Sequence, residues 1–402
     1  MTVTRRRWFS LGVLAVLLAG GFAVFAVWRG GKADSAEPLP GIAYSLGVCH
    51  TYPEPVGAAG YNNIAASVSD PLIVGGDVAA STDIGDGRHV WMFGDTSRDL
   101  GGQLVPAARN TMLLVGNGCR AVVVAPAGGA VIPDRDDGIG YWPMSLVSSH
   151  AGGVTTLTVS AQRVRGEEKA FQFTNLGPAL ATFLIPDGGA PRFVSVVDIG
   201  PDSESRATVG WGAAMAVDGE MAYIYGTSNP EEPLVFGFDV RLARVPLRSI
   251  SDVAAWRYWT GTAWTDDPSF ATEVIAPVGG VSQTFSVFHR GSTWYALSKR
   301  DGYLGTDLAL WPASQPWGPF GDPVTVGLIP NSADDRTILR YMPLAHPELI
   351  AASPDSIIVS VSRNSEDLAL LKQFPTLYRP YFIDVTIPPK ASNQVLNGPE
   401  PG

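Results

Sequence analysis

Short apolar segments separated by Asp-Gly pairs run through most of this 402-residue chain. Each pair combines a side chain that hydrogen-bonds its own backbone with a residue that accepts the left-handed conformation, which is the chemistry of tight turns. The pairs are Asp86-Gly87, Asp137-Gly138, Asp187-Gly188, Asp218-Gly219 and Asp301-Gly302. Strand signals stand near them, at 89–93, 121–124, 155–159, 221–225, 293–297 and 356–361. No sustained helical period follows residue 28, so the pattern predicts an all-β fold.

A looser repeat groups these strands. A small or apolar stretch, a polar turn and an aromatic-rich strand recur over 211–226, 285–297 and 344–361. The closing strands begin roughly 65–70 residues apart, a spacing that suits a propeller blade with inserted loops. Dividing about 345 residues by that spacing predicts one five-bladed β-propeller domain over 41–388. A pair of β-sandwiches is the alternative.

An uninterrupted apolar run, residues 8–28, follows three arginines near the N-terminus. At about 1.5 Å per residue, a helix of this length spans a bilayer core, whereas a cleaved signal usually has an apolar region of about 7–15 residues. The positive-inside rule keeps the arginines in the cytoplasm. We therefore expect residues 1–32 to be a basic end and a transmembrane signal anchor, with the remaining chain outside the cytoplasm.

Export followed by cleavage stays open, and the mature protein would then be secreted. Arg6-Arg7 is similar to a twin-arginine signal, and Ala33-Asp34-Ser35 has the small residues of a cleavage site. Residues 33–40 are a predicted linker and 389–402 a predicted disordered tail.

The charge balance limits the kinds of molecule that the chain can bind, and the cysteine content predicts a disulfide. Without the five basic residues of the first 32, the chain has 23 Lys and Arg against 38 Asp and Glu, a formal charge of −15. This balance argues against nucleic-acid binding. The two cysteines, Cys49 and Cys119, lie in the exported part, where an oxidising compartment favours a disulfide between them.

The chemistry that the sequence leaves open is hydrolysis by carboxylates. We find no Gly-x-Ser-x-Gly elbow, phosphate loop or His-Glu-x-x-His, and no clustered set among the five histidines. The segment 73–96 has the pattern of a hairpin. If 85–87 form a three-residue loop with Gly87 left-handed, facing residues have numbers that sum to 172, and Asp77 lies opposite Asp95.

Two facing carboxylates are destabilising unless they have a use. In a cleft their pKa values separate, leaving one acid and one base, which is what glycosidic cleavage needs. The structural alternative is that Asp95 in Gly-Asp-Thr is a turn former, and a one-residue slip would send the side chains to opposite faces. Ser81-x-Asp83-x-Gly85 starts like a sialidase Asp-box, but Arg88 stands where that motif needs an aromatic residue.

Several motifs, in order along the chain, resemble those of the five-bladed-propeller endo-D-arabinanases of glycoside hydrolase family 183, long catalogued as an actinobacterial domain of unknown function. They are Gly-Gly-Asp77, Trp91-Met-Phe-Gly-Asp95-Thr96, Trp211-Gly-Ala-Ala, Tyr223-Ile-Tyr-Gly-Thr227, Leu242-Ala-Arg-Val-Pro246, Trp317-Gly-Pro319, and Tyr341-x-Pro with His346-Pro-Glu348. The resemblance spans most of residues 60–385. It implies that Asp77 and Asp95 are catalytic, that the reaction inverts the anomeric centre, and that Asp95 is the acid and Asp77 the base.

Other polar and aromatic residues are candidates for substrate contact, each with a structural alternative. His346 and Glu348 open a predicted inner strand and either face the channel or form a turn. Trp142, Trp211 and Tyr341 are either platforms for furanose rings or buried blade aromatics. Arg109-Asn110 and Arg363-Asn364 are either orienting groups or ordinary turn residues.

The function implied by the resemblance is cleavage of internal α-linked D-arabinofuranosyl bonds in cell-envelope arabinan of arabinogalactan or lipoarabinomannan. A non-catalytic propeller that binds envelope glycan or a protein is the alternative, and hydrolysis of another glycan is a third. We expect a polysaccharide substrate, contact with the membrane through the anchor, a monomer, no metal in the site and no organic cofactor. A structural cation in the channel stays open.

Overall fold

The computed structural model describes residues 38–67, 70–99, 101, 104–126, 128–167, 172–330 and 338–388. The chain divides into two units, 1–38 and 39–402. The predicted anchor, most of the predicted linker and the predicted tail lie outside the described residues. Within the described part of the chain, no helix has the length and apolar character that crossing a membrane requires.

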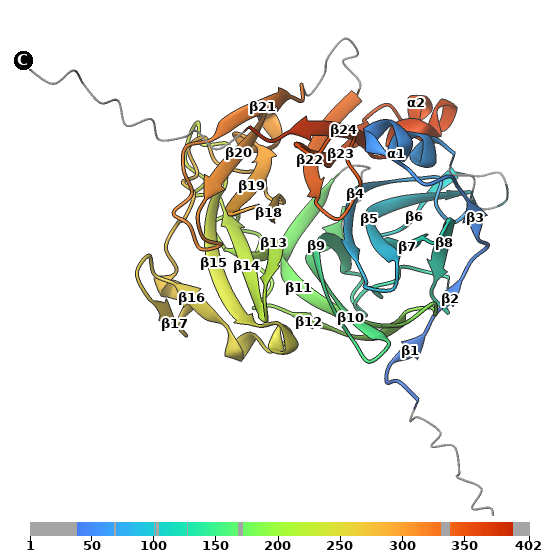
Figure 1. Ribbon diagram of the computed structural model, residues 1–402, viewed down its shortest axis with the longest axis horizontal. Coiled ribbons are helices and arrows are strands. Elements are labelled where there is room, and N and C mark those ends of the chain that lie inside the picture. Colours follow the sequence, from blue (N-terminus) through green and yellow to red (C-terminus); the bar gives the residue numbers. More distant parts are fainter. Residues whose placement is uncertain are drawn as a thin grey trace, which may run out of the picture. The chain divides into compact units, whose positions relative to one another are not determined.

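Five antiparallel sheets, which we call blades 1 to 5, make up the second unit. In Figure 1 their first strands lie nearest the centre. These inner strands are β4 (Gly75–Asp83), β9 (Gly140–Ala151), β13 (Gly210–Asp218), β18 (Ser286–Arg290) and β22 (Ile338–His346). Each inner strand contacts the next, and β22 contacts β4, which closes the ring. The five-bladed propeller is therefore confirmed, and the pair of sandwiches is not found.

The remaining strands extend each blade outward. Blade 1 adds β5 (Arg88–Asp99), β7 (Thr111–Gly116), β8 (Cys119–Val124) and β2 (Ser45–Leu46), with β3 (His50–Thr51) on β8 and β6 (Leu104–Ala108) on β5. Blade 2 adds β10 (Val154–Gly166), β11 (Phe173–Pro186), β12 (Arg192–Asp198) and β1 (Ile42–Ala43). Blade 3 adds β14 (Met221–Ser228), β15 (Asp239–Pro246), β16 (Arg257–Trp259) and β17 (Trp264–Thr265). Blade 4 adds β19 (Thr293–Lys299), β20 (Asp307–Ala313) and β21 (Val324–Leu328), and blade 5 adds β23 (Ser356–Ser365) and β24 (Tyr381–Thr386).

The helices are short. The α-helices are α1 (Gly57–Ala66) and α2 (Leu368–Gln373), and the 3₁₀ turns are η1 (Leu247–Ser249), η2 (Val253–Ala255), η3 (Pro268–Phe270), η4 (Gly302–Leu304) and η5 (Pro375–Tyr378). Helix α1 departs from the expectation of an all-β domain. Its sequence, Gly-Ala-Ala-Gly-Tyr-Asn-Asn-Ile-Ala-Ala, carries too few large apolar residues to show a helical period.

Five apolar clusters fill the spaces between neighbouring blades, one at each interface. Side chains along a strand alternate between two faces, so one strand supplies two clusters. In β5, Val90 and Met92 pack toward blade 2, whereas Trp91 and Phe93 pack toward blade 5. Burial on both faces explains why the predicted strands are continuous apolar runs instead of alternating ones. Glycine takes a left-handed φ in all five Asp-Gly pairs, as predicted.

The first described residues tie three blades together. β1 pairs with β12 of blade 2, β2 and β3 pair with β8 of blade 1, and α1 packs on β24 of blade 5. We call residues 42–66 the strap. Cys49 and Cys119 form the expected disulfide, with Cα atoms 5.5 Å apart, and it fastens the strap to blade 1.

Candidate active site

The β4–β5 hairpin brings Asp77 and Asp95 together at the inner edge of blade 1. The Ile84 amide donates to the Arg88 carbonyl at 3.0 Å and Gly87 has a φ of 83°, so the predicted three-residue loop forms. On both sides of Asp77 the pairing follows the predicted register, as in Gly76 with Thr96 and Ala80 with Met92.

The register is irregular at Asp77 itself. Gly76 pairs with Thr96 but Val78 pairs with Phe93, so Asp77 alone faces both Gly94 and Asp95. Such a bulge redirects a side chain. The next two residues, Val78 and Ala79, have φ angles of 67° and 56°, and a left-handed β-branched residue is a strained one.

Gly94 leaves room for one of the carboxylates. A Cβ atom at Gly94 would lie 2.5 Å from Asp77 Oδ1 and 3.0 Å from a Val78 methyl group. The Val78 amide donates to Ser362 Oγ of blade 5 at 3.0 Å, which holds the strained turn in place. The local backbone is therefore shaped around the Asp77 side chain.

Asp77 lies where its charge is poorly supported. Burial raises its pKa to about 7, and the nearby Asp95 carboxylate adds to the rise. The Tyr341 hydroxyl donates to Asp77 Oδ2 at 2.7 Å and opposes it. Asn364 hydrogen-bonds to Tyr341 and orients it. Asp77 therefore keeps a proton up to about neutral pH.

Asp95 has stronger support for its charge. Burial raises its pKa, but the Trp142 indole N–H, 2.7 Å from Oδ1, and the Arg109 guanidinium, 3.6 Å from Oδ1, oppose the rise. The Tyr378 hydroxyl donates to the Asp95 carbonyl at 2.7 Å and fixes the backbone. The ionised form is therefore better supported at Asp95 than at Asp77.

Two glycines on blade 2 let Arg109 reach Asp95. A Cβ atom on Gly140 would lie 2.4 Å from Arg109 Cγ, and one on Gly166 would lie 2.2 Å from Nη2. Any side chain at these two positions would displace the guanidinium. Arg109 is thus positioned by the absence of side chains on two neighbouring strands.

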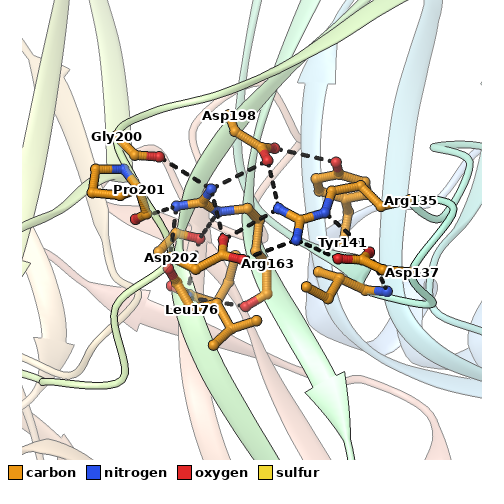
Figure 2. A network of polar contacts seen from close by, with 12 residues as sticks. Arg135, Asp137, Tyr141, Arg163, Leu176, Asp198, Gly200, Pro201 and Asp202 are labelled. Carbon is orange, nitrogen blue, oxygen red and sulfur yellow. Dashed lines mark hydrogen bonds and ion pairs between the residues drawn. The ribbon is translucent and has the colours of Figure 1, made fainter.

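A network of ion pairs on blade 2 holds the loop before β9 (Figure 2). Figure 2 shows the guanidinium groups of Arg135 and Arg163 gathered around Asp198 and Asp202. Asp198 Oδ2 lies 2.9 Å from Arg135 Nη1 and 3.2 Å from Arg163 Nη1. Arg163 is buried and also donates to backbone carbonyls, which ties the loop to the blade.

Asp134 stands in the segment that this network fixes. Arg135 follows it in the chain, and on the other side the Ile132 amide donates to Asn110 Oδ1 at 2.7 Å. The surrounding protein raises the pKa of Asp134 chiefly by desolvation, with Arg109 opposing the rise and Asp95 adding to it. Asp134 is therefore a third carboxylate in the field of the same arginine, and nothing in its local sequence indicated it.

The structure corrects several sequence predictions. Trp211 is buried in blade 3, where its ring packs on Trp256 and Tyr258. Asn110 is fully buried, and its amide is used on the backbone of Ile132 and Tyr141. Neither side chain is available to a substrate.

His346 and Glu348 are also mispredicted as substrate contacts. Both hydrogen-bond to Ser81 of β4, and His346 Nε2 lies 2.8 Å from Ser360 Oγ. Burial alone would raise the pKa of Glu348, yet contacts with His346 and Ser81 hold it below its ordinary value. This buried polar group joins blade 1 to blade 5. Arg363 likewise donates to the backbone of Arg379 and Thr376.

Two further site residues were missed by sequence reasoning. Tyr378 lies 283 positions from Asp95, and no local motif marks it. Phe173, which is 47% exposed, stands against Trp142 with ring centroids 4.5 Å apart. Together the rings of Trp142 and Phe173 form an apolar wall beside Asp95. Among the described residues, no group of three or more His, Cys, Asp or Glu side chains is placed to hold a metal ion.

Several solved structures are similar to this chain, and one of them superposes closely enough to show the same fold. A crystal structure from Bacteroides ovatus ATCC 8483, suggested by its description to be a hydrolase, superposes with a TM-score of 0.62 at 19% identity and covers 88% of this chain and 97% of that chain. A GH43_1 enzyme from Xanthomonas citri superposes with a TM-score of 0.42 at 15% identity and covers 81% of this chain and 93% of that chain. A GH43 beta-xylosidase/alpha-arabinofuranosidase from a compost metagenome superposes with a TM-score of 0.43 at 12% identity and covers 86% of this chain and 96% of that chain.

No curated protein matches the chain. A family model does match it, over residues 60–387, which is most of the propeller. The chain therefore belongs to the family described as "Domain of unknown function (DUF5005)".

Proposed function

We propose that this protein is a glycoside hydrolase whose acid and base are Asp77 and Asp95. The observation that carries the proposal is the bulged hairpin, in which two half-buried carboxylates face each other with different support for their charges. A fold seldom keeps such a pair, beside a left-handed valine, unless the arrangement has a use. Glycosidic cleavage uses one protonated and one ionised carboxyl group.

The ionised form is better supported at Asp95 than at Asp77, which favours Asp77 as the general acid and Asp95 as the general base. This is the reverse of the assignment that the family 183 resemblance implies. In the proposed reaction, Asp77 gives its proton to the leaving oxygen as the glycosidic bond breaks. Asp95 takes a proton from the water that attacks the anomeric carbon, which inverts the configuration. Trp142 and Arg109 keep Asp95 ionised for this role.

The proposed substrate is D-arabinan of the cell envelope, cut at internal α-linked D-arabinofuranosyl bonds outside the cytoplasm. The order of motifs shared with the endo-D-arabinanases supports this choice. The half-buried Trp142 and the exposed Phe173 support a sugar substrate in general, because aromatic faces cover the apolar faces of sugar rings. The Bacteroides ovatus protein of the same fold, suggested to be a hydrolase, is consistent with hydrolysis.

The test is release of oligosaccharides by the purified protein from arabinogalactan and lipoarabinomannan, followed by chromatography and by NMR of the first-formed anomer. We expect inverted products and a rate that falls above about pH 7, as Asp77 loses its proton. Asp77→Asn and Asp95→Asn should each lower kcat by about 10³-fold or more while substrate binding is retained. Asp266→Asn, an exposed change on blade 3, is the matched control and should leave the rate unchanged.

Two results would replace this proposal. Arabinan binding without turnover, unaffected by either asparagine variant, would identify a non-catalytic glycan-binding propeller. Turnover of another glycan in a substrate panel, but not of arabinan, would keep the acid and base and change the substrate.

A further inference from the structure

Two arginines face each other on blade 5. Arg340 of β22 and Arg363 of β23 are direct partners in the antiparallel ladder, and both are half-buried. Facing side chains have Cβ atoms about 4.5–5.5 Å apart, and like charges in such a pair are destabilising. Burial lowers the pKa of Arg363, and the charge of Arg340 lowers it further. The blade thus keeps two cations together at a cost in stability.

No carboxylate of the described residues forms an ion pair with either arginine. The ion pairs found in that part of the chain include neither Arg340 nor Arg363. Nη1 of Arg340 is buried and has no hydrogen-bond partner among the described residues, while the residue as a whole stays partly exposed. An anion that approaches the pair would relieve its repulsion and supply a hydrogen-bond acceptor.

Arg340 lies beside the candidate acid and base and not between them. The next residue, Tyr341, donates to Asp77 Oδ2 at 2.7 Å. Successive side chains of a strand point to opposite faces, so Arg340 does not share that contact. Lys299 Nζ donates to the Arg340 carbonyl at 3.1 Å, which fixes this part of β22 to blade 4. A ligand group at Arg340 is therefore one residue along the strand from the tyrosine that contacts Asp77.

Arg363 is connected to the other carboxylate. It donates through Nε to the Arg379 carbonyl at 3.2 Å and through Nη2 to the Thr376 carbonyl at 3.1 Å. These acceptors flank Tyr378, whose hydroxyl donates to the Asp95 carbonyl at 2.7 Å. The carbonyls orient the guanidinium group but carry no net charge that would cancel its own. Both arginines are therefore placed at the edge of the candidate active site.

We propose that Arg340 and Arg363 form a subsite for an anionic group, a carboxylate or a phosphate ester, on the sugar chain that reaches Asp77 and Asp95. Guanidinium groups bind both kinds of oxyanion through their N–H donors. The sugar chain as carrier of the anion rests on the proposed function, whereas the anion site itself does not. The substrate is then an anionic glycan, which the protein selects by its charge as well as by its rings.

The experiment compares sugars with and without a charge. Isothermal titration of the full chain with D-arabinose 5-phosphate should give saturable binding, tighter than that of D-arabinose by about tenfold or more. D-Glucuronate against D-glucose tests the carboxylate in the same way. The anion that gives the larger gain over its neutral sugar identifies the group that the subsite takes. Both gains should shrink as salt is added, because the added interaction is one between charges.

Variants of one arginine locate the subsite. Arg340→Gln should remove the preference for the charged sugar, and Arg340→Lys, which keeps the charge, should retain part of it. Arg248→Gln removes the same charge from an exposed position on η1 and is the matched control, with binding as in the wild type. The Arg340 side chain makes no hydrogen bond or ion pair with the described residues that the change would break. Arg340→Gln should therefore resist urea as well as the wild type or better, whereas loss of a structural contact would lower its stability.

Equal affinity for charged and neutral sugars, or an unchanged preference in Arg340→Gln, would overturn the proposal. An equal loss in Arg248→Gln would do the same, because the effect would then come from net charge alone. Below pH 7, where Asp77 carries its proton, Asp77→Asn should bind the charged sugar as the wild type does. Binding of the charged sugar by a protein that cleaves no glycan would refute the proposed function and leave the anion site standing. Glycan cleavage without a preference for the charged sugar would refute the anion site alone.

Discussion

The raised pKa of Asp77 lowers the free energy of unfolding once the pH exceeds about 4. Its pKa rises from 3.8 to about 7 on folding, so between these values the folded chain binds a proton that the unfolded chain lacks. The stability that this group contributes is complete below about pH 4 and is lost as the pH rises through 7. The folded protein must then carry a poorly supported charge, which is a cost that catalysis would explain.

Asp77→Asn should therefore stabilise the protein in a pH-dependent way. At pH 8 we expect a gain on the order of 2–4 kcal/mol in the free energy of unfolding, and little change near pH 4. Urea unfolding at both pH values measures it. Asp136→Asn, an exposed change, is the control and should leave both values unaltered. Equal or lower stability of Asp77→Asn at pH 8 would contradict the protonation state described for this residue.

Asp134 should tune Asp95 through their mutual repulsion and their shared arginine. Replacing Asp134 by Asn removes a negative charge, so the pKa of Asp95 should fall. The ionisable groups that face Asp95 are then Arg109 and Asp77, with the indole of Trp142 as a donor. The acidic limb of the pH–rate profile should move to lower pH by the same amount.

The Trp142 indole proton gives a readout that needs no activity. Because it is donated to Asp95, its NMR shift should follow the ionisation of that carboxyl group. Trp142→Phe assigns the signal, and Asp77→Asn removes the second titration. Asp134→Glu should restore the wild-type pKa, and Asp136→Asn should not move it. An unshifted Trp142 titration in Asp134→Asn would rule out the coupling.

Among the elements, α1 protects the edge of blade 5. The Asn62 side chain donates to the Phe382 carbonyl and accepts from the Phe382 amide, both at 2.8 Å, as a neighbouring strand would. Asp384 in turn accepts from the Ala58 amide at the start of the helix, where Val56 offers no side-chain cap. The helix and the edge strand thus satisfy each other's backbone groups.

Asn62→Ala should lower the free energy of unfolding by about 1–3 kcal/mol, because two backbone groups lose their partners. Asn63→Ala is a close control, since Asn63 is the next residue of the same helix and is exposed. That variant should be neutral or slightly stabilising, because alanine favours the helix. Equal effects of the two changes in urea unfolding would show that α1 does not support the edge of β24.

The strands and the hairpin were predictable because their signals are local. The Gly85-Asp86-Gly87 turn sets the register that brings Asp77 near Asp95. The bulge was not predictable, because Gly94 and the left-handed Val78 make sense only around a carboxylate already in place. Tyr378 and Asp134 come from distant segments, and their roles depend on contacts that no short motif encodes. Trp211 and His346 were misread because aromatic and polar residues of inner strands serve blade packing as readily as binding.

For the whole molecule, the strap links blades that are distant in the chain. The disulfide closes a sequence separation of 70 residues, for which loop entropy predicts a stabilisation of about 4 kcal/mol. Cys49→Ser/Cys119→Ser should lower the free energy of unfolding by that order, as measured by denaturant titration. Reduced wild type should match this variant, and a reducing agent should not affect the variant. A wild type that is insensitive to reduction would show that the strap holds without its covalent link.

The strap also decides where a mechanical load would act. A pull on the amino end of the described chain meets β1 first, and β1 has only two residues paired with β12. Force that passes this point reaches the Cys49–Cys119 bond and is delivered to β8, while Asp77 lies on β4 at the opposite edge of the same sheet. Traction would therefore be borne by the rim of blade 1, and the carboxylate pair would stay out of the line of force.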